Sequence, residues 1–382
     1  GESVNVAWRV FLQFLYLGCI SFGGPAAHIG YFRTVFVERK AWLNEQEFAA
    51  DLALCQFLPG PSSSQLGYAI ACRRGGIAAG VAAFIGFTLP SFLLMVALAV
   101  WQLELVQGSL QYGVVSGLKL LAVVVVADAV WGMAQQSCRS PLTIAVAVFS
   151  AVVLSLVMSP LWQISLMVIA ASLMAWRGLP TRHSSLMKVD SIFVACMLVF
   201  LLLVAVCVLF SDSIFAIFYQ AGSLVFGGGH VVLPLLEPLL NGGVSNDQFL
   251  LGYAAAQAVP GPMFSFAAYL GAVLRPDAPL YYALVATLAV FTPGFVLLTG
   301  IRGIWQQLSA RPRVIAAIAG VNAVAVGMLA AAWINPVFSS APHDVIALGL
   351  AVVGYIAVRS KRVPILLLVV VFSACGAILY SA

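Results

Sequence analysis

The chain of 382 residues has few charged side chains and long apolar runs. Only 8% of its residues are charged, whereas 63% are hydrophobic and the mean hydropathy is +1.06. This composition excludes a soluble globular domain and predicts a multi-pass membrane protein. Because only short loops separate the apolar runs, we expect the lipid bilayer to surround the chain, and we expect no nucleic-acid partner.

Paired cysteines and the motifs of hydrolytic or nucleotide chemistry are also absent. Seven cysteines are scattered without any C-x-x-C pair, which speaks against a disulfide framework and against a metal site. No H-E-x-x-H, G-x-S-x-G or Walker A motif occurs. We therefore predict no cofactor, no metal and no enzymatic activity. The alternative from another class is an intramembrane enzyme that uses His28 or His230 as a base.

Two Pro-Gly-Pro tripeptides interrupt apolar segments of the chain. Each follows a Gln-x-x sequence, and the two copies, 201 positions apart, are Pro59-Gly60-Pro61 and Pro260-Gly261-Pro262. A helix must break at each copy, because proline lacks the backbone N–H and clashes with the preceding turn. A new helix is expected to start at Pro61, where free backbone N–H groups and three serine hydroxyls predict an anion-binding site.

Aligning the two tripeptides reveals an internal repeat from about Trp8 to Trp176 and from Ile214 to Tyr380. The matched positions include Phe22-Gly23-Gly24 with Phe226-Gly227-Gly228, Phe48 with Phe249, Pro90 with Pro293, and Gly117 with Gly320. We divide the chain into residues 1–190, the first repeat with a linker, and residues 191–382, an extra span with the second repeat.

Each repeat is predicted to begin with two helical hairpins, one broken at the Gly-Gly tip and one at the Pro-Gly-Pro tip. An arm of about 12 residues rises only about 18 Å, so most arms are too short to cross a hydrocarbon core of about 30 Å. We therefore expect re-entrant hairpins that line a cavity. Uninterrupted spans are expected at 77–101, 111–135, 142–158, 161–176, 191–210, 280–300, 314–333, 345–358 and 364–380.

The basic residues indicate the orientation. With the linker in the cytoplasm, 16 of the 18 Lys and Arg residues fall on the cytoplasmic side, as does the N-terminus. The exceptions are Lys119 and Arg275. The loop from Arg33 to Lys40 is basic, whereas its counterpart from Pro234 to Gly243 is not, so the two repeats are predicted to be inverted. An inverted repeat with broken helices is typical of secondary transporters, whose substrate site lies between the halves.

The two glycine tips, Phe22-Gly23-Gly24-Pro25 and Phe226-Gly227-Gly228-Gly229-His230, together with the two Pro-Gly-Pro tips, resemble the chromate ion transporter family in its long, two-repeat form. The resemblance covers essentially the whole chain. It implies chromate export across a bacterial inner membrane and chromate resistance, with sulfate as a structural mimic. The first glycine tip departs from the Gly-Gly-Gly-His pattern, because Pro25 and Ala26 occupy it and His28 comes two positions later.

Chromate and sulfate are tetrahedral dianions without a proton to donate at neutral pH. A site of N–H and O–H donors without carboxylates suits both and disfavours protonated phosphate. The candidate substrate-binding residues supply such donors or let the backbone approach the ion: Gly23, Gly24, Gln56, Ser62, Ser63, Ser64, Lys119, Gly228, Gly229, His230, Gln257 and Ser265. Helix capping is the alternative for the three serines after Pro61, and hydrogen bonding to freed carbonyls is the alternative for the two glutamines.

Lys119 is a lysine deep inside a predicted span, and its repeat equivalent is Asn322. Because a buried cation is costly unless it is paired, we expect Lys119 to balance the charge of the dianion. Asp128 lies nine residues further along, on the opposite face of the same helix, so any pairing of Lys119 would need another helix. His28 and His230 could contact the anion or carry a proton, or they could be satisfied structural histidines.

Two functional alternatives stay open. A sulfate or other oxyanion carrier would use the same donors, and a channel with the same tips would differ in whether flux saturates. Export needs no coupling ion, because moving two negative charges out of a cell that is about 100 mV negative inside releases about 4.6 kcal/mol. The sequence leaves the oligomeric state open, a homodimer included.

Overall fold

The computed structural model describes residues 1–102, 108–177, 186–240 and 242–381, and the regular elements of this described part are all helical. Six of the described helices are long and apolar enough to cross a membrane. This confirms the prediction of an all-helical, polytopic membrane protein. Arg182 and most of the predicted linker lie outside the described residues.

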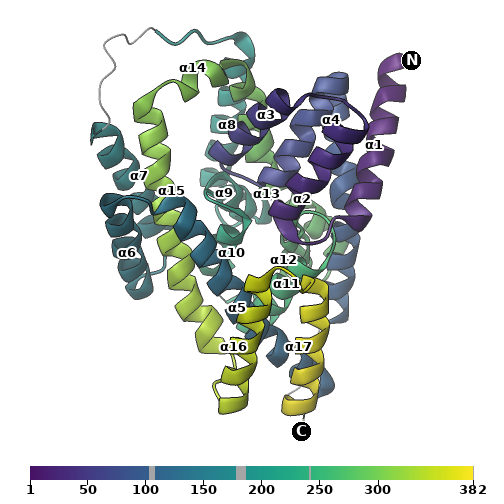
Figure 1. The fold of residues 1–382 in the computed structure, drawn as a ribbon, viewed down its shortest axis with the longest axis vertical. Helices are drawn as coiled ribbons and strands as arrows, with labels where there is room; N and C mark the ends of the chain where they lie inside the picture. Colours follow the sequence, from purple (N-terminus) through teal and green to yellow (C-terminus); the bar gives the residue numbers. More distant parts are fainter. Residues whose placement is uncertain (103–107, 178–185, 241, 382) are drawn as a thin grey trace.

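The first repeat and the extra span form helices at nearly all the predicted places (Figure 1). They are α1 (Glu2–Ile20), α2 (Gly24–Phe32), η1 (Arg33–Arg39), α3 (Glu45–Phe57), α4 (Ser62–Trp101), α5 (Leu110–Ser137), α6 (Pro141–Leu156), α7 (Pro160–Arg177) and α8 (Ser191–Leu209).

The second repeat has the same order of hairpins and spans, with shorter helical pieces after its two tips. They are α9 (Ile214–Ser223), η2 (Gly229–Val231), α10 (Val232–Leu236), η3 (Glu237–Leu240), α11 (Asn246–Ala258), η4 (Met263–Ser265), α12 (Phe266–Leu274), α13 (Pro279–Ile301), η5 (Arg302–Ile304), α14 (Trp305–Ser309), α15 (Pro312–Ala332), η6 (Trp333–Phe338), α16 (Val345–Ser360) and α17 (Ile365–Tyr380).

All four predicted breaks are present, but α1 is longer than the predicted arm. Helix α1 has 19 residues and is one of the helices long and apolar enough to be a candidate membrane span. Within α4 the backbone leaves the helical conformation at Gly75 and Gly76, so the arm after Pro61 and the following span are separate helical segments, as predicted. Re-entry of the hairpins into the bilayer stays a prediction.

The last two helices of each repeat pack on the other repeat. Helices α6 and α7 contact α15, whereas α16 and α17 contact α5. Equivalent glycines allow these approaches: Gly117 has no room for a Cβ beside the Phe372 carbonyl, and a Cβ at Gly320 would lie 2.6 Å from the Ala170 carbonyl oxygen. This reciprocal exchange is the arrangement expected of two repeats related by a twofold axis.

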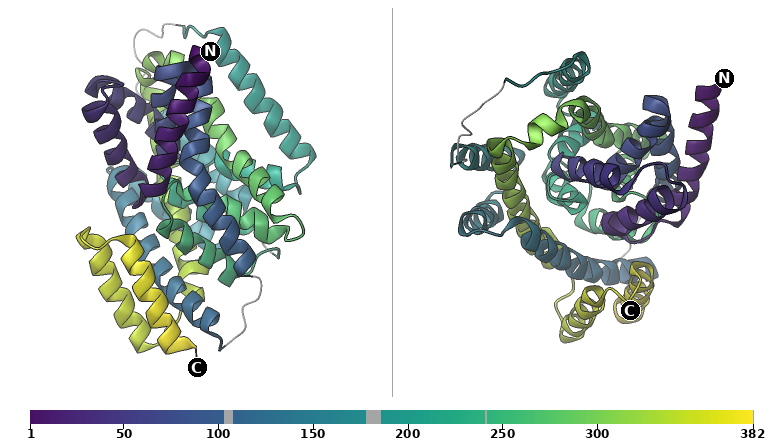
Figure 2. Two further views of the ribbon diagram at one scale, coloured as in Figure 1. Left: turned by 90° about the vertical axis from the view of Figure 1, so that its right-hand side faces the viewer. Right: turned by 45° about the horizontal axis from the view of Figure 1, so that its top comes forward.

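Helices α5 and α15 cross each other beside the hairpins. Trp333, which follows α15, donates its indole N–H to the Val123 carbonyl of α5 at 2.8 Å. Figure 2 shows that α5 and α15 curve along one side of the hairpin group, with α6, α7, α16 and α17 outside them. The molecule therefore consists of a hairpin group and a group of crossed spans, and the helix breaks lie in the former.

Candidate functional site

The four helix breaks meet through a symmetric pair of backbone hydrogen bonds. Gly60, in the first Pro-Gly-Pro tip, donates its N–H to the Val225 carbonyl at 2.8 Å, and Gly261, in the second, donates to the Ser21 carbonyl at 2.9 Å. Ser21 and Val225 are repeat equivalents, and each immediately precedes the Phe-Gly-Gly of a glycine tip. Each repeat therefore binds its Pro-Gly-Pro tip to the glycine tip of the other, which brings all four breaks together.

Glycine is required at the centre of each Pro-Gly-Pro tip. Gly60 has φ = 125° and Gly261 has φ = 93°, values in the left-handed half of the Ramachandran plot that strain other residues. Space is short as well, because a Cβ would lie 3.0 Å from Gln65 Nε2 at Gly60 and 3.0 Å from the Phe87 carbonyl oxygen at Gly261. A side chain at either position would disturb the contact between the repeats.

His28 is a satisfied structural histidine in this conformation. Its Nε2 lies 2.9 Å from the Ser21 carbonyl oxygen and its Nδ1 lies 3.2 Å from Ser63 Oγ, and the side chain is fully buried. Since a carbonyl only accepts, Nε2 must carry the proton, and Nδ1 then accepts the hydroxyl hydrogen of Ser63. The Ser63 donor predicted for a substrate is thus engaged with His28.

Ser64 and Ser265 are repeat equivalents with different surroundings. Ser265 Oγ is hydrogen-bonded to Ser91 Oγ of α4. The residue equivalent to Ser91 is Gly294, which has no side chain. Ser64 Oγ is buried and has no hydrogen-bond partner within the described residues. Its hydroxyl is therefore available to another acceptor.

Two other buried hydroxyls beside the tips resemble the hydroxyl of Ser64. Ser21 Oγ and Thr88 Oγ1 are buried without a partner in the described part of the chain. Helix α4 has Pro61 as its N-cap residue and no side-chain capping bond, so the capping interpretation of the three serines is not supported. Ser62, by contrast, is partly exposed. Buried hydroxyls without partners are costly, which makes them candidates for contact with a bound group.

Gln65, rather than Gln56, satisfies the carbonyls at the first tip. Its Nε2 donates to the Pro59 carbonyl at 3.1 Å and to the Gly294 carbonyl at 3.0 Å. Gln56 is exposed, and Gln257 contacts Met263 Sδ at 2.8 Å. Repeat symmetry drew attention to Gln56 and Gln257, whereas the equivalent of Gln65 is Phe266, and this is why sequence reasoning missed Gln65.

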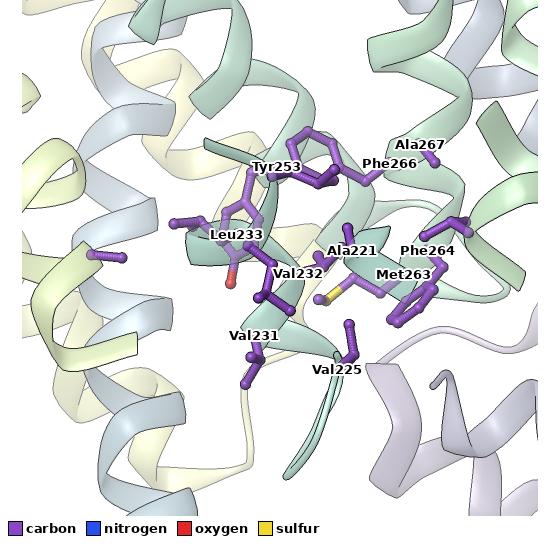
Figure 3. Close-up of a cluster of buried hydrophobic side chains, with 14 of the residues drawn as sticks. Ala221, Val225, Val231, Val232, Leu233, Tyr253, Met263, Phe264, Phe266 and Ala267 are labelled. Atoms are coloured by element: carbon purple, nitrogen blue, oxygen red, sulfur yellow. The ribbon is translucent and has the colours of Figure 1, made fainter. Parts of the chain in front are cut away.

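The second glycine tip faces the crossing of α5 and α15. A Cβ at Gly227 would lie 3.2 Å from Met133 Cε and 3.9 Å from Asn322 Oδ1, an atom without a partner among the described residues. His230 Nδ1 is 2.6 Å from the hydroxyl of Tyr253. Figure 3 shows Val231 and Tyr253 on one side of this tip and Val225, Met263 and Phe264 on the other.

The candidate glycines differ in exposure. Gly23 is exposed and Gly24 and Gly228 are half-buried, whereas Gly229 is buried and lies against Met263 and Phe264. Three of the four predicted tip glycines can therefore be approached by a ligand in this conformation.

Lys119 forms an ion pair with another helix. Its Nζ lies 2.8 Å from Asp247 Oδ1 in the first turn of α11, and Lys119 is only 7% exposed. The exclusion of Asp128 as its partner is confirmed, because Asp128 pairs with Arg359 at 3.4 Å. In this conformation the charge of Lys119 is balanced by a carboxylate of the second repeat.

Comparison with known proteins gives the family. A sequence model described as Chromate transporter matches residues 8–176 and again residues 213–379. The chain belongs to the chromate transporter family. The two matches agree with the internal repeat predicted from the positions of the tips, and the extra span α8 lies outside both matches. No solved structure matches this chain.

Several relatives of the family are similar over most of their length. A "Probable chromate transport protein" of Synechococcus elongatus is 26% identical over 96% of this chain and 94% of its own. A "Chromate transport protein" of Pseudomonas aeruginosa is 27% identical over 86% of this chain and 80% of its own. An uncharacterized transporter of Methanocaldococcus jannaschii is 27% identical over 79% of this chain and 77% of its own.

Proposed function

We propose that the chain is a secondary transporter that exports chromate across a bacterial inner membrane and so confers chromate resistance. The observation that carries the proposal is the meeting of the four helix breaks around Gly60, Gly261 and their carbonyl partners. Beside them lie the buried hydroxyls of Ser21, Ser64 and Thr88, which have no hydrogen-bond partner among the described residues. Membership of the chromate transporter family and the named relatives support chromate as the substrate.

The donor set suits a tetrahedral dianion. Hydroxyl donors and the N-termini of α2 and α4 attract negative charge, and none of the candidate site residues is a carboxylate. Ser64 and Ser62, with the glycines Gly23, Gly24 and Gly228, are the residues that we expect to contact the ion. Sulfate presents the same four oxygens, so a sulfate carrier on this scaffold is the runner-up. Lys119 would join the site only in a conformation that frees it from Asp247.

The basic loops support a cytoplasmic N-terminus, and the membrane potential allows export without a coupling ion. Two negative charges leaving a cell that is about 100 mV negative inside release about 4.6 kcal/mol, enough for a gradient above about a thousandfold. We assign residues 1–190 to the first repeat with its linker, and residues 191–382 to the extra span with the second, inverted repeat.

Flux through the purified protein in liposomes tests the proposal, with the membrane potential clamped first at zero and then negative inside. We expect saturable chromate efflux that the potential accelerates and that sulfate inhibits by competition. Flux that rises linearly with chromate would indicate a channel. Flux that appears only with a proton or sodium gradient would contradict uncoupled export, and sulfate flux without chromate flux would favour the sulfate carrier.

A further inference from the structure

The hairpin group keeps the twofold symmetry of the repeats. Besides the paired tip hydrogen bonds, Gly18 packs against the Phe87 carbonyl in the first repeat, and its equivalent Gly222 packs against the equivalent Val290 carbonyl in the second. The hairpin backbones therefore obey the twofold relation at these contacts, so we next compare how the crossed spans α5 and α15 pack on them.

The spans do break the symmetry. Helix α11 packs against α5, whereas its equivalent α3 packs mainly against α4. On α11, Leu251 and Ala254 are each 2% exposed and belong to one apolar cluster with Val115 and Leu118 of α5. Figure 1 shows α11 beside α5, with α3 at the other end of the hairpin group.

The equivalent face of α3 is open. Its residues are Ala49, Ala50, Ala53 and Gln56, and all four are exposed. Their equivalents on α11 are Leu250, Leu251, Ala254 and Gln257. The spacing of the four α3 residues places them on one stripe of the helix. In an inverted repeat, the equivalent partner of this stripe is the first half of α15, as the first half of α5 is the partner of α11.

The first half of α15 is correspondingly less buried than that of α5. Residues 113 and 115–119 of α5 are all buried, whereas among their equivalents in α15, residues 316 and 318–322, Gly320 and Val321 are buried and the other four are only partly buried. Alanines occupy positions 316, 317 and 319, and small residues on both helices would allow their backbones to approach closely.

We propose that the α3 face of Ala49, Ala50, Ala53 and Gln56 is the surface on which α15 docks in the opposite state of the transport cycle. In the present state α5 covers α11 instead, and the Lys119–Asp247 ion pair holds that contact closed. This inference rests on the proposed transport function. If the basic loop 33–40 before α3 is cytoplasmic, the present state is open to the cytoplasm and closed to the outside.

The two contacts differ in chemistry. The equivalents of Lys119 and Asp247 are Asn322 and Gln46, so the opposite state would replace an ion pair by an amide pair. Gln46 is exposed, and Asn322 Oδ1 has no hydrogen-bond partner among the described residues. Removing the ion pair should therefore shift the population towards the state in which α15 covers α3.

Cysteine reactivity at two equivalent positions tests the proposal in a variant without the seven native cysteines. Ala53→Cys reports on the α3 face and Ala254→Cys is its matched control on the covered α11 face. We expect maleimide to label Cys at 53 readily and at 254 slowly. Adding Asp247→Asn should raise labelling at 254 by about tenfold or more and lower it at 53, because an unpaired buried charge is strongly destabilising.

Unchanged labelling at both positions, or faster labelling at both, would overturn the proposal, because docking of α15 requires opposite changes. A second measurement identifies the occupant. Gln46→Cys with Asn322→Cys should form an oxidant-induced disulfide in the Asp247→Asn background and form it much less without that change. Lack of any disulfide, with a monodisperse protein, would contradict docking by α15.

Chromate flux in the same cysteine-free protein separates this proposal from the proposed function. Opposite changes in labelling at positions 53 and 254 without chromate flux would support the docking surface and contradict chromate as the substrate. Chromate flux without these opposite changes would support chromate as the substrate and contradict the docking surface.

Discussion

The amide of Gly60 and the carbonyl of Val225, 2.8 Å apart, join the Pro-Gly-Pro tip of one repeat to the glycine tip of the other, and Gly261 and Ser21 form the equivalent bond. The two bonds place broken backbone from both repeats in one buried volume. Irregular backbone at membrane depth is tolerated only where protein buries it or where it lines a cavity. The contact between the repeats is therefore also the framework of the proposed substrate site.

Gly60→Ala and Gly261→Ala should each destabilise the protein. Both positions have positive φ and little space for a Cβ, so each substitution should cost about 1–3 kcal/mol and reduce transport. Thermal unfolding of the purified variants measures the effect. Gly30→Ala is the control, because a Cβ there meets no atom within 4 Å, and equal stability of all three variants would refute the strain at the tips.

Ser64→Ala should weaken substrate binding without destabilising the fold. Its hydroxyl is buried without a described partner, so its removal costs the folded protein no hydrogen bond, whereas a bond to a dianion would be lost. We expect the half-saturating chromate concentration to rise about tenfold, with an unchanged or higher melting temperature. Ser155→Ala, on an exposed serine bonded to its own helix, should leave both values unchanged. A lower melting temperature with normal affinity would assign Ser64 a structural role.

His28→Ala should have the opposite effects, lowering stability and leaving chromate affinity unchanged. The imidazole links the Ser21 carbonyl to Ser63 and packs edge-on against Phe87, with ring centroids 5.3 Å apart. Its loss should lower the melting temperature and the yield, since a lost buried hydrogen bond costs about 1–3 kcal/mol. The surviving protein should keep its chromate affinity. A stable variant with weakened affinity would place His28 in the substrate site instead.

Lys119→Met should impair transport because it leaves Asp247 without its partner. The double variant Lys119→Met with Asp247→Asn removes both charges, so it should recover most of the flux that the single variant loses. Chromate flux in liposomes, corrected for the amount of inserted protein, gives the comparison. If the double variant is as inactive as the single one, Lys119 acts directly on the dianion.

Most of the fold was predictable because its determinants are local. Two prolines flanking a glycine break a helix, and the repeat duplicates this break at Gly60 and Gly261, so the tips could be located without coordinates. The interruption of α4 at Gly75 and Gly76 also falls between the predicted arm and the predicted span. The length of α1 was underestimated because nothing local marks its start.

The partners within the site were less predictable. Lys119 required a partner from another helix, but which carboxylate it meets depends on how α5 packs against α11. That packing differs between the repeats. Ser91 and Gln65 went unnoticed because their repeat equivalents are Gly294 and Phe266, and a search guided by symmetry passes over residues that break it.

Equilibrium dialysis of chromate against the purified protein tests the central claim, that the meeting tips bind a tetrahedral dianion, most directly. The account predicts saturable binding that sulfate displaces, that phosphate displaces poorly, and that Ser64→Ala weakens about tenfold while Ser155→Ala does not. Absence of saturable binding, or binding that is equally strong in both variants and in the wild type, would contradict it.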